Sequence, residues 1–145
     1  MKRFCVLLCL LLLLLTGCGG KGSPAPKIED FFWQMATVQS TEDEGRAIAY
    51  GPGSNTVPAA AAEVLLHCAA ADGTIALTDE TNGRTYSGTY RLTESNRETS
   101  IYEVTVGEAK GMAVVSMTAY HDGSRMPAFI LRLGDYALNF LPAAE

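Results

Sequence analysis

The sequence predicts an all-β fold, an antiparallel up-and-down meander of about eight or nine strands. Turn pairs such as Asp72-Gly73, Asn82-Gly83 and Asp122-Gly123 recur at short intervals, and such pairs supply the positive φ angles of tight hairpins. The stretches between them alternate apolar and polar residues with period 2, which is typical of strands with one wet face. A meander of this length can close into a barrel, which leaves no exposed edge.

The expected strands follow one another along the chain, each ended by a turn signal. The clearest alternation lies in 85–92, where Tyr86, Gly88 and Tyr90 share one face. The run 112–120 is apolar on both faces, which indicates a central or strongly bent strand. In chain order, we expect strands at 33–40, 45–50, 63–70, 74–79, 85–92, 100–106, 112–120, 127–133 and 136–141.

Two segments are ambiguous. Residues 58–71 have high helix propensity, with Pro58 at a favoured first helical position, but the Asp-Gly turn and clear strand that follow favour a hairpin. We expect a strand from about Glu63, with a helical turn before it as an alternative. Apolar residues at helical spacing from Ile28 onward predict a short helix that plugs one end of the barrel and runs into the first strand.

The first 18 residues carry a targeting signal. Two basic residues are followed by Phe4 to Leu15, twelve apolar residues, whereas a spanning helix needs roughly 20. The stretch Leu15-Thr16-Gly17-Cys18 then resembles a bacterial lipobox. The resemblance implies that a diacylglyceryl group is attached to Cys18 and that a peptidase removes residues 1–17 as a signal peptide.

The lipid on Cys18 would make the membrane a partner of this chain. Residues 18–27 are rich in Gly and Pro and form an expected flexible tether, and 28–145 form a single β-barrel-like domain. The nine residues after Cys18 span roughly 16 to 18 Å as a flexible chain. We therefore expect a lipid-anchored protein that lies close to the cell membrane on its extracytoplasmic face.

Net charge and cysteine content argue against nucleic acid as a partner and against an intrachain disulfide. Loss of Lys2 and Arg3 with the signal leaves 9 of the 11 basic residues against 16 acidic ones, a net charge of −7. So acidic a chain repels nucleic acid, which we exclude as a partner. After processing and lipidation only Cys68 remains free, so no intrachain disulfide can form, and we expect Cys68 to be a small buried hydrophobe.

No pattern supports an enzyme, a cofactor or a metal site, and we expect none. His67 and Cys68 are adjacent, so on a strand they point to opposite faces and cannot form a dyad. Ser116 with His121 and Asp122 lacks a nucleophile elbow, and Cys68 with His121 lacks a spacing signature. Calcium could bind at Glu42-Asp43-Glu44, but we expect this acidic run to be a solvated loop. The segment 79–83 lacks the alternating oxygen ligands of a calcium loop and is expected to be a hairpin turn.

The meander resembles the lipocalin-like calyx proteins over residues 31–141. An early Trp33 and Gly88-Thr89-Tyr90 on a middle strand carry the resemblance, although Phe31 stands where the usual Gly-x-Trp opening has glycine. The resemblance implies a barrel that holds a small apolar ligand. The aromatic side chains expected to contact that ligand are Trp33, Tyr86, Tyr90, Tyr102, Phe129 and Tyr136.

We therefore predict a membrane-anchored, non-enzymatic binder of a small apolar or amphipathic molecule. The alternative is a protein-interaction or envelope-assembly module, which would have an envelope protein partner, an occluded interior and no small-molecule ligand. A cavity in the barrel is the feature that discriminates between them.

Overall fold

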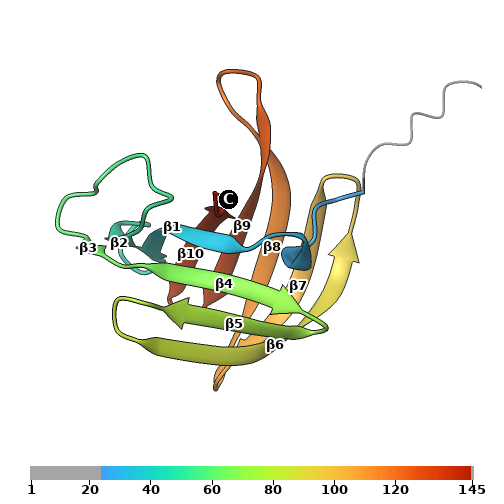
Figure 1. Ribbon diagram of the computed structural model, residues 1–145, viewed down its shortest axis with the longest axis horizontal. Coiled ribbons are helices and arrows are strands. Elements are labelled where there is room, and N and C mark those ends of the chain that lie inside the picture. The colour runs from blue at the N-terminus through green and yellow to red at the C-terminus, as the bar shows by residue number, and fades with distance from the viewer. Residues whose placement is uncertain (1–23, 145) are drawn as a thin grey trace, which may run out of the picture.

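Eight antiparallel strands close into a barrel in the computed structural model, which describes residues 24–144 (Figure 1). The predicted fold class is therefore confirmed. The expected signal peptide and Cys18 lie outside the described residues. The elements are η1 (Ile28–Asp30, a 3-10 turn), β1 (Trp33–Ser40), β2 (Ala47–Tyr50), β3 (Ala62–Glu63), β4 (Leu66–Ala71), β5 (Thr74–Asp79), β6 (Arg84–Ser95), β7 (Thr99–Val106), β8 (Ala109–Ala119), β9 (Arg125–Leu133) and β10 (Tyr136–Pro142).

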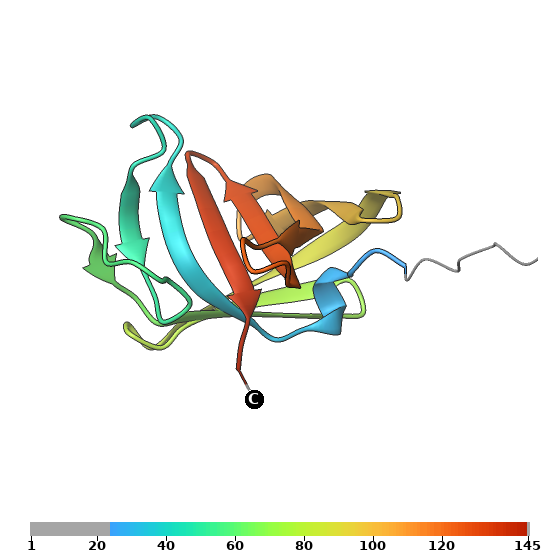
Figure 2. The ribbon, with the colours of Figure 1, turned by 90° about the horizontal axis from the view of Figure 1, so that it is seen from above.

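Strands β4 to β10 form the meander, in which each strand pairs with the next along the chain. The ring closes because β1 pairs with β10 on one side and, at Trp33 and Gln34, with β4 on the other. The second half of β1 pairs instead with β2, and β3 adds to β2 in parallel. Figure 2 shows β2 beside β1 and β3 beyond β2, both outside the ring of eight.

Most predicted strands are present, and the differences follow from local backbone geometry. The strand expected at 45–50 begins at Ala47 because Glu44 and Gly45 have positive φ angles of 52° and 74° and belong to a turn. The strand expected at 63–70 is two strands, since the chain leaves β2 after Glu63 and joins β5 only from Leu66.

The helical alternatives near residue 60 and at the N-terminus resolve into single turns. Pro58 to Ala61 form a turn closed by a hydrogen bond from Ala61 N to Pro58 O, and Ala60 has a φ of 61°. The expected plugging helix is the short 3-10 turn η1, whose Ile28 is fully buried. Among residues 24–144, no helix has the length and apolar character needed to cross a membrane.

The two ends of the barrel differ. Element η1 and the β4–β5, β6–β7 and β8–β9 connections lie at one end, which we call the plugged end. The β1–β2, β5–β6, β7–β8 and β9–β10 connections lie at the other, the open end. Figure 1 shows the chain entering the domain at the plugged end, beside η1 and the β6–β7 hairpin. Ala25 and Pro26, in the segment expected to be a tether, are buried there.

Two glycines allow neighbouring strands to approach closely. A Cβ built at Gly111 would lie 1.8 Å from the Arg132 carbonyl oxygen, and one built at Gly88 would lie 1.9 Å from that of Thr105. No side chain fits at such distances, so β8 and β6 depend on glycine at these positions.

We expect Gly111→Ala to lower the free energy of unfolding by about 2 kcal/mol or more, because the new methyl group must push β9 away. Lys110→Ala, an exposed neighbour on the same strand, is the control and should change stability by less than about 0.5 kcal/mol. Urea unfolding of both variants measures the difference. A Gly111→Ala variant as stable as the parent would contradict the close approach.

Candidate functional site

The centre of the barrel is filled by aromatic side chains. Trp33 packs on Phe129 with ring centroids 5.3 Å apart, and Phe129 stacks on Phe140 at 4.9 Å with an interplanar angle of 17°. All three are buried, because strand alternation places each of them on the inner face. The middle of the barrel is thus a packed core rather than a hollow calyx.

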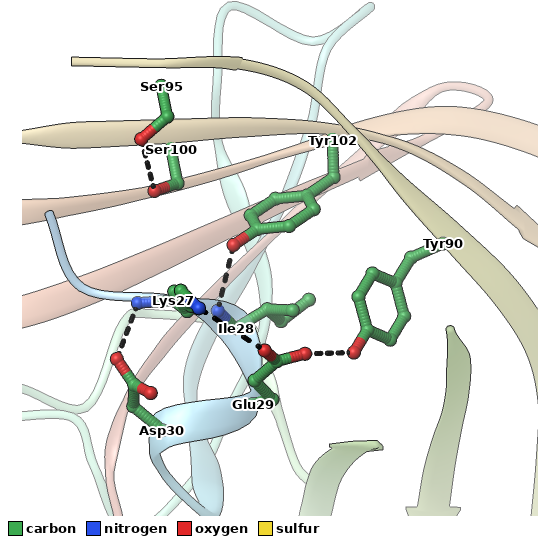
Figure 3. Close-up of polar contacts among 8 residues, drawn as sticks. All are labelled: Lys27, Ile28, Glu29, Asp30, Tyr90, Ser95, Ser100 and Tyr102. Atoms are coloured by element: carbon green, nitrogen blue, oxygen red, sulfur yellow. Dashed lines mark hydrogen bonds and ion pairs between the residues drawn. The ribbon is translucent and has the colours of Figure 1, made fainter. Parts of the chain in front are cut away.

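The plugged end is closed by η1 (Figure 3). The buried Ile28 donates its backbone N–H to the Tyr102 hydroxyl over 3.3 Å, and its carbonyl accepts the Trp33 indole N–H at 2.7 Å. Tyr90 donates its hydroxyl to Glu29. Burial, followed by this hydrogen bond, raises the pKa of Tyr90 to about 12. The aromatic residues of this end therefore hold the plug in place.

An apolar cup of about 500 Å³ lies at the open end. Its floor is formed by inward-facing residues that continue the core, namely Val38, Leu133 and Leu138. Tyr86 and Tyr136 form its rim and are 44% and 49% exposed. The complete lining is Val38, Ile48, Asp79, Tyr86, Leu133, Tyr136 and Leu138.

Local register explains why these side chains converge. On β9 and β10, Leu133 lies opposite Tyr136, and Leu131 lies opposite Leu138, so the inner faces of both strands reach the mouth together. A bulge after Met35 shifts the register of β1 by one residue, and it keeps Val38 on the inner face. The cup is therefore the uncovered end of the same inner face that forms the core.

Asp79 is the only charged residue in the lining of the cup. It ends β5 on the inner face, two residues after the buried Leu77, and is only 9% exposed. Its carboxylate accepts hydrogen bonds from the Asn82 backbone N–H at 3.0 Å and from the Asn82 side-chain amide at 2.7 Å. None of the ion pairs formed within residues 24–144 includes Asp79.

A second hollow, of about 600 Å³, lies at the plugged end between the entering chain and the β6–β7 and β8–β9 hairpins. Charged side chains form much of its wall, and two of them, Arg125 and Glu98, pair with each other at 3.0 Å. The cup at the open end is therefore the better candidate for an apolar or amphipathic ligand.

The six aromatic residues predicted to bind a ligand fall into two groups. Trp33, Tyr102 and Phe129 are buried in the core, and Tyr90 is tied to the plug through Glu29. Only two of the six, Tyr86 and Tyr136, line the cup.

Sequence reasoning missed Asp79, which it placed at the end of the strand expected at 74–79 without a role in a site. The signal was present, because the alternation Ile75, Leu77, Asp79 already places this carboxylate on the inner face. The apolar floor was missed for another reason. The floor is exposed because η1 covers the other end of the barrel. The spacing of residues in the sequence does not predict which end η1 covers.

The lining of the cup includes none of His67, Cys68 and His121. Cys68 is buried on the inner face as predicted, and burial raises the pKa of its thiol to about 12. His67, on the opposite face of β4, stacks on Phe32 and lies 3.5 Å from Glu80. Within the described part of the chain, no three His, Cys, Asp or Glu side chains converge to hold a metal ion.

The chain matches no protein-family model, no curated protein and no solved structure. The interpretation of the cup therefore rests on its own residues and geometry.

The buried thiol predicts a loss of stability in alkaline solution. The pKa of Cys68 is about 12 in the folded protein against a reference value of 9.0, so above about pH 9 the unfolded chain loses this proton first. The free energy of unfolding should then fall with rising pH, approaching about 1.4 kcal/mol per pH unit. Tyr90 adds to the loss only above about pH 10.

Cys68→Ala should be less stable at pH 7, because it leaves a small cavity, but should lose less stability between pH 9 and 10. Denaturant unfolding of both proteins under reducing conditions measures the two slopes. Equal slopes would show that the thiol does not carry the effect.

Proposed function

We propose that this chain is an exported lipoprotein, anchored through Cys18, and that it binds a small apolar or amphipathic ligand in the cup at the open end of its barrel. The cup is the observation that carries the proposal. Binding sites for small molecules are typically concave and apolar, with roughly 300 to 1,000 Å³ of volume and a few polar groups. The cup has this character, with apolar walls, two tyrosine hydroxyls and one carboxylate.

The barrel supports a lipocalin-like interpretation, with one modification. A closed antiparallel meander with one end plugged just before a buried tryptophan agrees with the resemblance in the sequence. The packed stack of Trp33, Phe129 and Phe140 fills the middle of the barrel, where a calyx would hold its ligand. We therefore place binding in a shallow site that contacts one part of the ligand, rather than in a deep calyx.

The anchor would also orient the cup. Six chain steps join Cys18 to Pro24, and they reach at most about 20 Å when fully extended. Because Pro24 lies at the plugged end, a lipid on Cys18 would hold that end near the bilayer. The cup would then face the aqueous side, and its ligand would enter from there rather than directly from the membrane.

Anchoring is tested by labelling with a radioactive or clickable fatty acid in a bacterial host. We expect the parent chain to incorporate the label and to fractionate with membranes, whereas Cys18→Ser does neither. Cys68→Ser is the matched control and should label like the parent, because Cys68 is a buried thiol. An unlabelled parent chain that retains its initiating methionine would contradict the lipoprotein proposal.

Ligand binding is tested with N-phenyl-1-naphthylamine, a probe without charge at neutral pH that fluoresces in apolar sites. Tyr136→Ser should weaken its binding several-fold, because the side chain forms the rim of the cup. Met126→Ser, a comparably exposed apolar residue at the plugged end, should bind the probe as the parent does. Absence of saturable binding, or equal loss in both variants, would contradict a ligand site in the cup.

A second candidate, the interaction module, is favoured by the packed middle of the barrel and by a small apolar area on the outer wall. Met112 and Ile130 are 42% and 38% exposed there and, with Val114 and Arg132, line a shallow groove on β8 and β9. This function requires a recurrent partner, crosslinked in intact cells through Met112 or Ile130. Substitutions at the rim of the cup would leave such crosslinks unchanged.

A further inference from the structure

We infer that the cup recognises a cationic amine carried on an apolar body, with the Asp79 carboxylate as its counter-charge. The inference deepens the proposed function and rests on it. Three features of the described residues support it: a buried carboxylate without a charged partner, the tyrosine rings at the rim, and the apolar floor.

The first feature is the incomplete pairing of Asp79. Burying a carboxylate is unfavourable unless hydrogen bonds and an opposite charge compensate for lost hydration. Asn82 supplies two hydrogen bonds from neutral donors. An ionised carboxylate has about four acceptor positions, so part of its capacity stays available to a ligand in the cup.

Within residues 24–144, no cationic side chain pairs with Asp79. Arg84 lies opposite Asp79 in the β5–β6 register, but its side chain is exposed and forms no ion pair with Asp79. A ligand ammonium group could therefore take a position that Arg84 leaves free. It would form charge-assisted hydrogen bonds, which are stronger than those between neutral groups.

The rim and the floor suit the rest of such a ligand. The faces of Tyr86 and Tyr136 attract cations, which contributes about 0.5 to 1 kcal/mol at exposed sites. The floor of Val38, Leu133 and Leu138 offers apolar surface to the body of the molecule. Fatty acids and phosphate-bearing lipids are disfavoured, because their negative charge would lie against Asp79.

The test compares dansylcadaverine, which has a primary amine, with its N-acetylated form, which has the same body without the charge. The protein is purified in its exported form and held in zwitterionic nanodiscs, and empty nanodiscs give the background. We expect the amine to bind at least about tenfold more tightly than the acetylated probe, as a hydrogen bond to a charged group would produce.

Asp79→Asn should abolish this preference while leaving the affinity for the acetylated probe unchanged, which also shows that the variant is folded. Asp135→Asn, an exposed carboxyl in the β9–β10 turn at the same end, should retain the preference. If both probes bind the parent equally, or Asp79→Asn keeps the preference, the amine inference is wrong and the cup remains a binding site. If neither probe binds, the proposed function fails as well.

Discussion

The packing of Trp33 against Phe129, and of Phe129 against Phe140, is the constraint on which the rest of the structure depends. These rings join β1, β9 and β10 across the closing seam of the barrel, so they stabilise the closure and also fill the interior. With the centre occupied and η1 docked at one end, an apolar part of the inner face stays exposed at the opposite mouth. The same aromatic packing therefore stabilises the closed barrel and restricts the candidate ligand site to its open end.

The two ends are chemically different, although both are lined by tyrosines. At the plugged end, Tyr90 and Tyr102 use their hydroxyls to hold the backbone and side chains of η1. At the open end, Tyr86 and Tyr136 remain exposed around the buried Asp79. An anchored plugged end and an open acidic mouth would give the domain a direction, with its attachment at one pole and recognition at the other.

The fold class and most strands follow from the sequence, because hairpin turn residues and period-2 alternation act locally. The division of 63–70 into β3 and β4 could not be predicted in this way, since it depends on pairing with β2, a strand distant in sequence. The same limit applies to the site. Alternation places Tyr86 and Trp33 equally on inner faces. Only the three-dimensional structure shows that Trp33 is buried beside η1, whereas Tyr86 lies exposed at the open end.

The position of the ligand site is tested most directly by mapping a bound probe by NMR on the isotope-labelled protein. Titration with N-phenyl-1-naphthylamine should shift the side-chain resonances of Leu133, Tyr136 and Leu138 and leave those of Ile28 in place. Shifts centred on Met112 and Ile130 would contradict this account and place recognition on the outer wall. Shifts centred on Trp33 and Phe129 would also contradict it, because they would mean that the aromatic core opens to admit a ligand.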